Sequence, residues 1–110
     1  MIDTIEVIIQ NGALLSKHFV LKCDELKAYL PFDAVNISKE FLDNLVSTIR
    51  SWKNEYGSDS KIDSEEFTVI VTSNDKTIDK FHGKGIYPDN YNYFTELLGE
   101  IKWLKILTNF

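Results

Sequence analysis

The alternation of hydrophobic and polar residues along the chain predicts two β-hairpins. Residues 4–9 are rich in β-branched side chains, and Asn11-Gly12 after them is the residue pair of a tight turn. Residues 13–21 alternate and are expected to form the returning strand. The second hairpin is predicted from the alternation over 66–72, which is followed by turn residues and a returning strand over 77–81.

A period of three to four residues predicts two long helices. The first is expected to start at Ser38, a suitable N-cap, and its hydrophobic spacing continues to Tyr56, before Gly57. The second is expected to start after Pro88, because proline suits the first helical turn. The hydrophobic stripe of this second helix consists of Tyr91, Phe94, Leu97, Leu98, Ile101 and Leu104.

The remaining segments are expected to be short or irregular. Residues 23–30 suit a short helical turn, 32–37 a connection and 58–65 an exposed loop. The order hairpin, helix, hairpin, helix predicts a single α+β domain over residues 1–110, with an antiparallel four-stranded sheet and both long helices on one face. The sequence leaves open whether the first strand pairs with the fourth or the second with the third at the centre of the sheet.

The chain is acidic, with a net charge of −5 and a pI of about 4.9. An acidic surface repels phosphate backbones, so direct nucleic-acid binding is not expected. Two interpretations of the acidity stay open: it keeps the domain in solution, or it attracts a basic protein partner. Seven Phe, five Tyr and two Trp supply a core and also residues suited to protein interfaces.

The compartment is inferred from what the sequence lacks. Cys23 is the single cysteine, so an intrachain disulfide is excluded. Residues 1–9 include Asp3 and Glu6 instead of the basic start of a signal peptide, and no apolar run is long enough to span a membrane. A cytoplasmic protein without membrane attachment is therefore expected.

The reactive residue types do not form a recognisable catalytic or metal-binding pattern. His18 and His82 lack the spaced partners of known metal motifs, and the acidic residues after Cys23 would raise the pKa of its thiol. The segment 82–85, His-Gly-Lys-Gly, lacks the first glycine and the hydroxyl of a phosphate-binding loop, so a strand-to-helix connection is favoured. We therefore expect no catalytic residue, no metal and no cofactor.

The densest acidic run lies between the first long helix and the second hairpin. It consists of Glu55, Asp59, Asp63, Glu65 and Glu66. Such a run is either a solvated loop or a docking surface that speeds association with a basic protein. A calcium loop is not indicated, because the regular ligand spacing and the central glycine are missing.

The C-terminal segment is unusually apolar. Trp103 and Leu107 share a helical face that differs from the predicted inner stripe. Either the helix is buried on two sides, or Trp103 contacts a partner protein or a second copy of the chain. A homodimer therefore stays possible.

The segment 81–90, Phe-His-Gly-Lys-Gly-Ile-Tyr-Pro-Asp-Asn, resembles the closing motif of small uncharacterised bacterial proteins of the accessory and immunity type. The strand 67–71 before it and Phe94, Leu97 and Leu98 after it fit that pattern, which covers the C-terminal half of the chain. The resemblance implies a hairpin, a G-x-x-x-Y-P-x-N motif and a short helix. It also implies an immunity role beside a toxin, structural roles for the motif residues, and no catalytic residues.

These observations favour a non-catalytic protein-binding protein, most concretely a cytoplasmic immunity protein that neutralises a basic toxin or effector by occlusion. The acidic run would steer the partner, and Tyr87, Tyr91 and Tyr93 would supply aromatic contacts. One alternative is a structural or regulatory homodimeric subunit. A third class is a small enzyme that uses His82 with an acidic residue such as Asp79.

Overall fold

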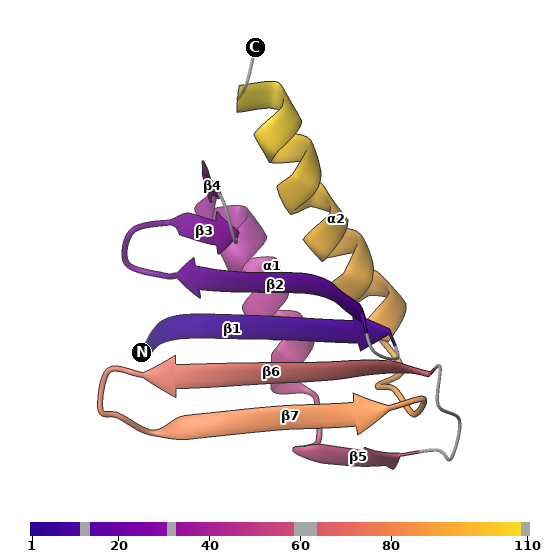
Figure 1. The fold of residues 1–110 in the computed structure, drawn as a ribbon. Helices are drawn as coiled ribbons and strands as arrows, with labels where there is room; N and C mark the ends of the chain where they lie inside the picture. The colour runs from indigo at the N-terminus through magenta and orange to yellow at the C-terminus, as the bar shows by residue number, and fades with distance from the viewer. Residues whose placement is uncertain (12–13, 31–32, 59–63, 109–110) are drawn as a thin grey trace.

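The computed structural model shows an α+β fold with two helices and one seven-stranded mixed sheet (Figure 1). The structure describes residues 1–11, 14–30, 33–58 and 64–108, and among these the side chains of all but 14–16 and 102–108. In chain order the elements are β1 (Ile2–Asn11), β2 (Leu14–Lys22), β3 (Lys27–Leu30), β4 (Asp33–Asn36), α1 (Lys39–Arg50), β5 (Glu55–Ser58), β6 (Glu65–Ser73), β7 (Ile78–Lys84) and α2 (Tyr91–Thr108).

The pairing of β1 with β6 forms the centre of the sheet and joins the two halves of the chain. The strand order is β4-β3-β2-β1-β6-β7-β5, and only β5 and β7 are parallel neighbours. Val7 lies opposite Val69, and Ile9 opposite Phe67. Both expected central pairings are therefore wrong. The first predicted strand pairs with the third, because these two long strands each bury a continuous apolar row that is best shielded at the centre of the sheet.

The prediction of four strands is also wrong, because three short strands extend the sheet. Residues 23–30 and 32–37, expected to be a helical turn and a connection, instead contain β3 and β4. A turn with Leu26 at a φ of 52° reverses the chain between β2 and β3. Ala28 and Val35 then face the core, with 0% and 4% of their surface exposed. Strands of four residues contain too little alternation to be distinguished from a turn.

Helix α1 starts as predicted and ends earlier than predicted. The Ser38 side chain accepts a hydrogen bond from the Phe41 amide at 3.0 Å, which confirms it as the N-cap. The helix ends at Arg50, and Tyr56 lies in β5 beside β7. Gly57 has a φ of 84° but lies in β5 and not at a helix C-terminus. Tyr56 fits the helical spacing in the sequence because its side chain, like those of the helix, packs against the core, although it does so from a strand.

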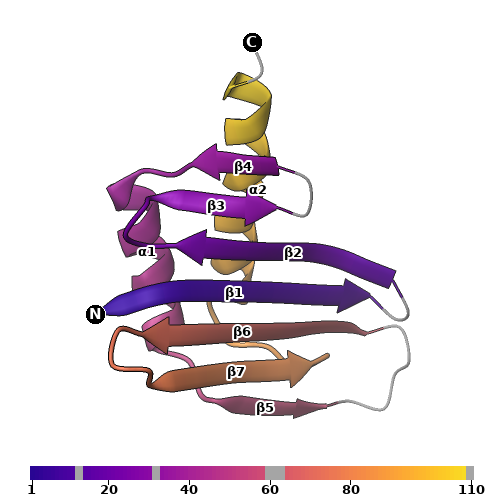
Figure 2. The same ribbon diagram turned by 60° about the vertical axis from the view of Figure 1, so that its left-hand side comes forward.

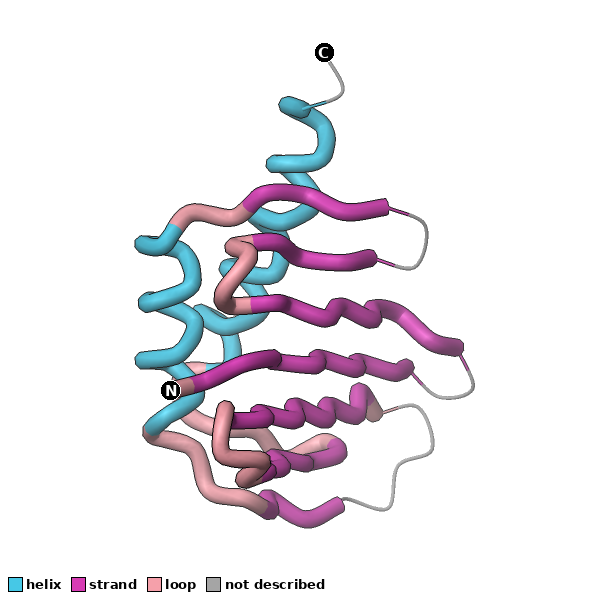
Figure 3. The backbone as a smooth tube through the Cα atoms, turned by 90° about the vertical axis from the view of Figure 1, so that its left-hand side faces the viewer, coloured by secondary structure: helices cyan, strands magenta, loops and turns pink. Residues whose placement is uncertain are grey.

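Both helices lie on the same side of the sheet, as predicted (Figures 2 and 3). The covered face carries the alternate residues of the strands, such as Ile5, Val7 and Ile9 of β1, which are at most 1% exposed. No helix among the described residues is both long enough and apolar enough to cross a membrane. We call the opposite face, which carries Glu6 and Ile8 of β1, the open face.

Trp52 joins the end of α1 to the start of α2. Its ring makes edge contacts with Phe67 at a centroid distance of 5.4 Å and with Phe94 at 4.8 Å. Its indole N–H donates to Asn90 Oδ1 at 2.6 Å, and Asn90 Nδ2 donates to the Thr48 carbonyl oxygen at 3.1 Å. The asparagine of the 81–90 motif therefore ties the two helices together, and its role is structural.

We predict that Asn90→Ala lowers the free energy of unfolding by about 1–3 kcal/mol, because the largely buried Trp52 N–H loses its acceptor. Urea denaturation followed by tryptophan fluorescence measures this loss. Asn92→Ala, on the exposed side of the same helix turn, is the matched control and should change the free energy of unfolding by less than about 0.5 kcal/mol. Equal stability of the two variants would contradict the assigned role of Asn90.

Candidate functional site

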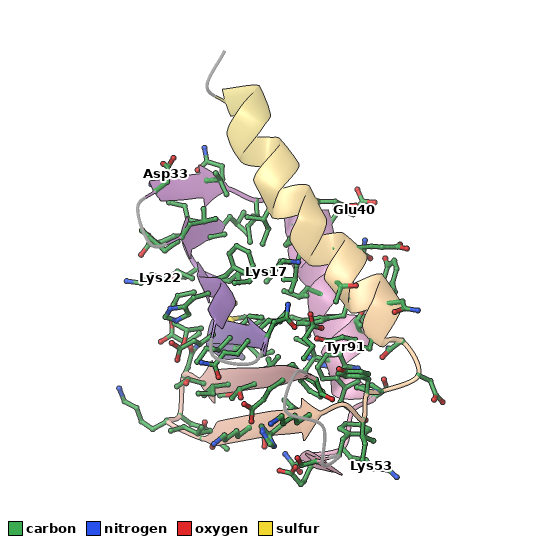
Figure 4. The ribbon with its side chains drawn as sticks, turned by 45° about the vertical axis from the view of Figure 1, so that its right-hand side comes forward. Lys17, Lys22, Asp33, Glu40, Lys53 and Tyr91 are labelled. Atoms are coloured by element: carbon green, nitrogen blue, oxygen red, sulfur yellow. The ribbon has the colours of Figure 1, made fainter. Side chains whose placement is uncertain are left out.

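Several of the predicted partner-binding residues come together at one corner of the molecule, where β5, β6 and β7 meet the start of α2. Figure 4 labels Tyr91 at the base of α2 and Lys53 near β5. Strand pairing brings Glu55 of β5 beside His82 of β7. We call this group the acidic corner, and it consists of Glu55, Glu65, Glu66, His82, Tyr87 and Tyr91.

His82 is held between two carboxylates. Its Nδ1 lies 2.9 Å from Glu55 Oε1, and its Nε2 lies 2.6 Å from Glu66 Oε2. The strands position all three side chains: Thr68 lies opposite His82, and the alternation of β6 places Glu66 on the same open face, one pair further along. A single imidazole therefore bridges three neighbouring strands at the edge of the sheet.

The two carboxylates favour the protonated imidazole. The hydrogen bonds to Glu66 and Glu55 raise the pKa of His82, because they stabilise its charged form. The hydrogen bonds from His82 and from the Gly57 amide lower the pKa of Glu55. We call His82 with Glu55 and Glu66 the clamp, and protonation of its imidazole offsets the charge of one of the two carboxylates.

The other half of the acidic corner is built from tyrosine hydroxyls. Tyr91 donates to Glu65 Oε2 at 2.6 Å, and Tyr87 donates to the Glu65 carbonyl oxygen at 2.9 Å. The two rings are stacked, with centroids 4.6 Å apart. Burial raises the pKa of Tyr91 far above its usual range, so the hydroxyl stays a donor. This half of the corner anchors α2 to the start of β6.

Both ring nitrogens of His82 contact carboxylates, so neither nitrogen is free to exchange a proton with a substrate in this arrangement. Asp79, which we considered as an enzymatic partner, lies three residues before His82 on β7. Three residues along a strand place two side chains on opposite faces of the sheet. The structure therefore does not bring Asp79 and His82 together.

The described residues contain no group of three or more His, Cys, Asp or Glu side chains arranged to hold a metal ion. His18, the other histidine, lies on the open face with its Nε2 2.7 Å from Glu6 Oε2. Each histidine of the chain is thus paired with carboxylate on the same face of the sheet.

The two glycines of the segment 82–85 stand at positions where the backbone geometry favours glycine. A Cβ at Gly83 would lie 2.5 Å from the Ile86 carbonyl oxygen and 2.7 Å from Phe67 Cε1, so only glycine fits there. Gly85 has a φ of 74°, which favours glycine. The interpretation of this segment as a strand-to-helix connection is wrong for residues 82–84, which belong to β7, whereas Gly85 lies in the connection.

The predicted aromatic contact residues differ in how much of their surface is exposed. Tyr91 is only 6% exposed, so little of its ring is available to a partner, whereas Tyr93 on α2 is 46% exposed. Asp59, Asp63 and the side chain of Trp103 lie outside the described residues.

Sequence reasoning missed a second group of acidic residues, which line two adjoining hollows at one end of the fold. Asp3, Asp24, Asp43 and Asp79 make no ion pair with any described residue. They come from β1, the turn after β2, α1 and β7, and they are too far apart in the sequence to form a motif. Nothing in the spacing of these residues signals that they lie at the same end of the fold.

We predict that stability declines as the pH rises through the pKa of His82 in the folded state. This pKa is raised above the value of about 6.5 in the unfolded chain, so the stabilisation is fully present below pH 6.5 and is lost as the folded histidine deprotonates. An NMR titration of the ring protons measures this pKa. Glu66→Gln should bring it back toward 6.5.

Glu96→Gln, on the exposed face of α2, removes the same charge without touching the clamp and is the matched control. A pKa of His82 at or below 6.5 in the unmodified protein would show that the clamp does not form in solution.

Comparisons of the chain with protein-family models, with curated proteins and with solved structures found no match.

Proposed function

We propose that this protein is a non-catalytic binding protein that recognises a basic protein partner. Its most concrete form is an immunity-type protein that neutralises a toxin or effector by covering it. The observation that carries the proposal is the unequal pairing of acidic side chains. Carboxylates on the open face are paired with histidine, whereas a separate group at the other end of the sheet is unpaired.

The carboxylates of the open face and of the acidic corner lie beside basic side chains, which weakens the attraction that they exert over long distances. Glu6 faces His18, and Glu55 and Glu66 share His82. Lys80 and Lys84 alternate with His82 on the same face of β7. The acidic corner is therefore a weaker steering surface than its sequence suggests, because basic side chains lie beside its carboxylates.

Three members of the unpaired group, Asp3, Asp24 and Asp43, line one groove, together with Lys39 and Arg50. Asp3 and Asp24 both lie close enough to Cys23 to add to the effect of burial in raising the pKa of its thiol. Clustered charges of one sign increase the association rate of an oppositely charged protein by about 10- to 1,000-fold. A basic partner fits this field, whereas a nucleic acid does not.

The rigid sheet suits inhibition by occlusion. The central strands β2, β1, β6 and β7 have 7 to 10 residues each and pair antiparallel with one another, with register shifts only near the two ends of β1. A surface supported by such a sheet changes little on binding, so little conformational entropy is lost when a partner is covered.

A second candidate function, a homodimeric subunit, is favoured by the aliphatic residues of the open face. Ile8, Val20 and Ile70 are half-buried across three neighbouring strands, and Ile78 at the rim is 64% exposed. Light scattering over a range of protein concentrations separates a dimer from a monomer that awaits a different partner.

We predict that affinity capture with the tagged protein from its native cell lysate recovers one stoichiometric basic protein, which salt releases. The association rate of the purified pair should fall steeply as ionic strength rises, while the dissociation rate changes much less, because salt screens the long-range attraction. Recovery of this protein alone, or an association rate that is independent of salt, would contradict the proposal.

A further inference from the structure

A groove of about 780 Å³ runs between α1 and the strand ends at the start of β1. Figure 3 shows α1 beside the start of β1, with the turn that joins β2 to β3 above it. The groove continues into a smaller hollow of about 330 Å³ toward the turn between β6 and β7, because Ile2, Val46 and Arg50 line both. This groove lies at the opposite end of the sheet from the acidic corner.

One wall of the groove is a full-length stripe of α1. The residues that form it are Lys39, Leu42, Asp43, Val46, Ser47 and Arg50. They are spaced by three and four residues and extend over eleven, which is about 16 Å of helix. The groove is therefore long enough to hold about three turns of a second helix beside α1.

The floor of the groove is apolar and incompletely covered. Ile2, Cys23, Leu26 and Val46 pack against the core with part of their surface exposed. Burial, together with Asp3 and Asp24, raises the pKa of Cys23 to about 11, so the thiol is uncharged at neutral pH. It acts as a small hydrophobic residue on this floor.

The charges around the floor have a definite arrangement. Asp3 and Asp24 lie on the strand wall, Asp43 lies on α1, and none of them has an ion-pair partner among the described residues. Lys39 and Arg50 line the groove from the first and last residues of α1. A basic group is therefore accommodated best between the two ends of the helix.

We infer that this groove binds an amphipathic helical segment of the partner, whose apolar residues contact Ile2, Leu26 and Val46 and whose central Lys or Arg residues face Asp3, Asp24 and Asp43. A helix in an apolar groove is a recurrent mode of recognition, in which residues at helical spacing act as anchors. The inference rests on the proposed protein-binding function and specifies where and how a basic partner docks.

The test uses the full-length protein and two synthetic peptides of the length of α1. One is an amphipathic helix of Leu and Lys, and the other carries Glu in place of every Lys. In an NMR titration, the Leu–Lys peptide should shift the amide signals of Ile2, Asp24 and Val46, and the Leu–Glu peptide should not. Shifts confined to the open face or to the acidic corner, or no binding at all, would overturn the inference.

Variants separate the charged and apolar contributions. The double variant Asp24→Lys/Asp43→Lys should weaken peptide binding by about tenfold or more, because it replaces two attractive charge contacts with repulsive ones. Glu96→Lys/Glu100→Lys makes the same change in net charge on the exposed side of α2 and should have a much smaller effect. Equal losses in both double variants would show that only net charge matters, and the groove would be rejected.

Val46→Gln tests the apolar floor without changing the charge. It should weaken the Leu–Lys peptide severalfold while the urea denaturation midpoint stays close to that of the unmodified protein, because Val46 is only partly buried. Unchanged peptide affinity would reject the apolar contact.

The outcomes for the groove and for the overall function are distinguishable. A captured partner that binds the Asp24→Lys/Asp43→Lys variant as tightly as the unmodified protein removes the groove and leaves the binding function intact. Peptide binding in the groove without any captured partner supports the groove and argues against the immunity-type role.

Discussion

The structure depends on the pairing of β1 with β6. This pairing places the N-terminal strand in the middle of a sheet whose other half is formed after α1, so neither half of the chain can complete its own core. Val7 and Val69 lie opposite each other with no exposed surface. The remaining strands are added outward from this pair, and α1 crosses the covered face because it connects β4 at one edge of the sheet to β5 at the opposite edge.

The sequence predicted the elements that local chemistry determines. The Ser38 cap, the alternation of the four long strands and the start of α2 all depend on residues close in the chain. The short strands, the end of α1 at Arg50 and the strand order depend on contacts between distant residues. Trp52 illustrates the limit: its spacing suits the helix, but the acceptor that fixes its position is Asn90, 38 residues away.

The sequence showed which residue types are present near the candidate site, but it did not show which of the charged side chains are paired. The acidic run and the tyrosines Tyr87 and Tyr91 were visible in the sequence, and the structure places Glu55 and Glu66 on the two sides of His82. The sequence could not show that His82 lies between them. Nor could it show that acidic residues as distant as Asp3 and Asp43 line one groove. Whether a carboxylate has an ion-pair partner depends on which side chains the fold places beside it, and the number of acidic residues in the sequence does not show this.

The His82 clamp has a consequence for the behaviour of the chain in concentrated solution. Without β5, the sheet would end at β7, whose seven residues would present unpaired backbone groups to other molecules. β5 covers that edge with only four residues, and the bridge from Glu55 to His82 fastens it there. The contact between Glu55 and His82 therefore helps to keep the longer edge of β7 paired within its own sheet, where it is not available to a strand of another molecule.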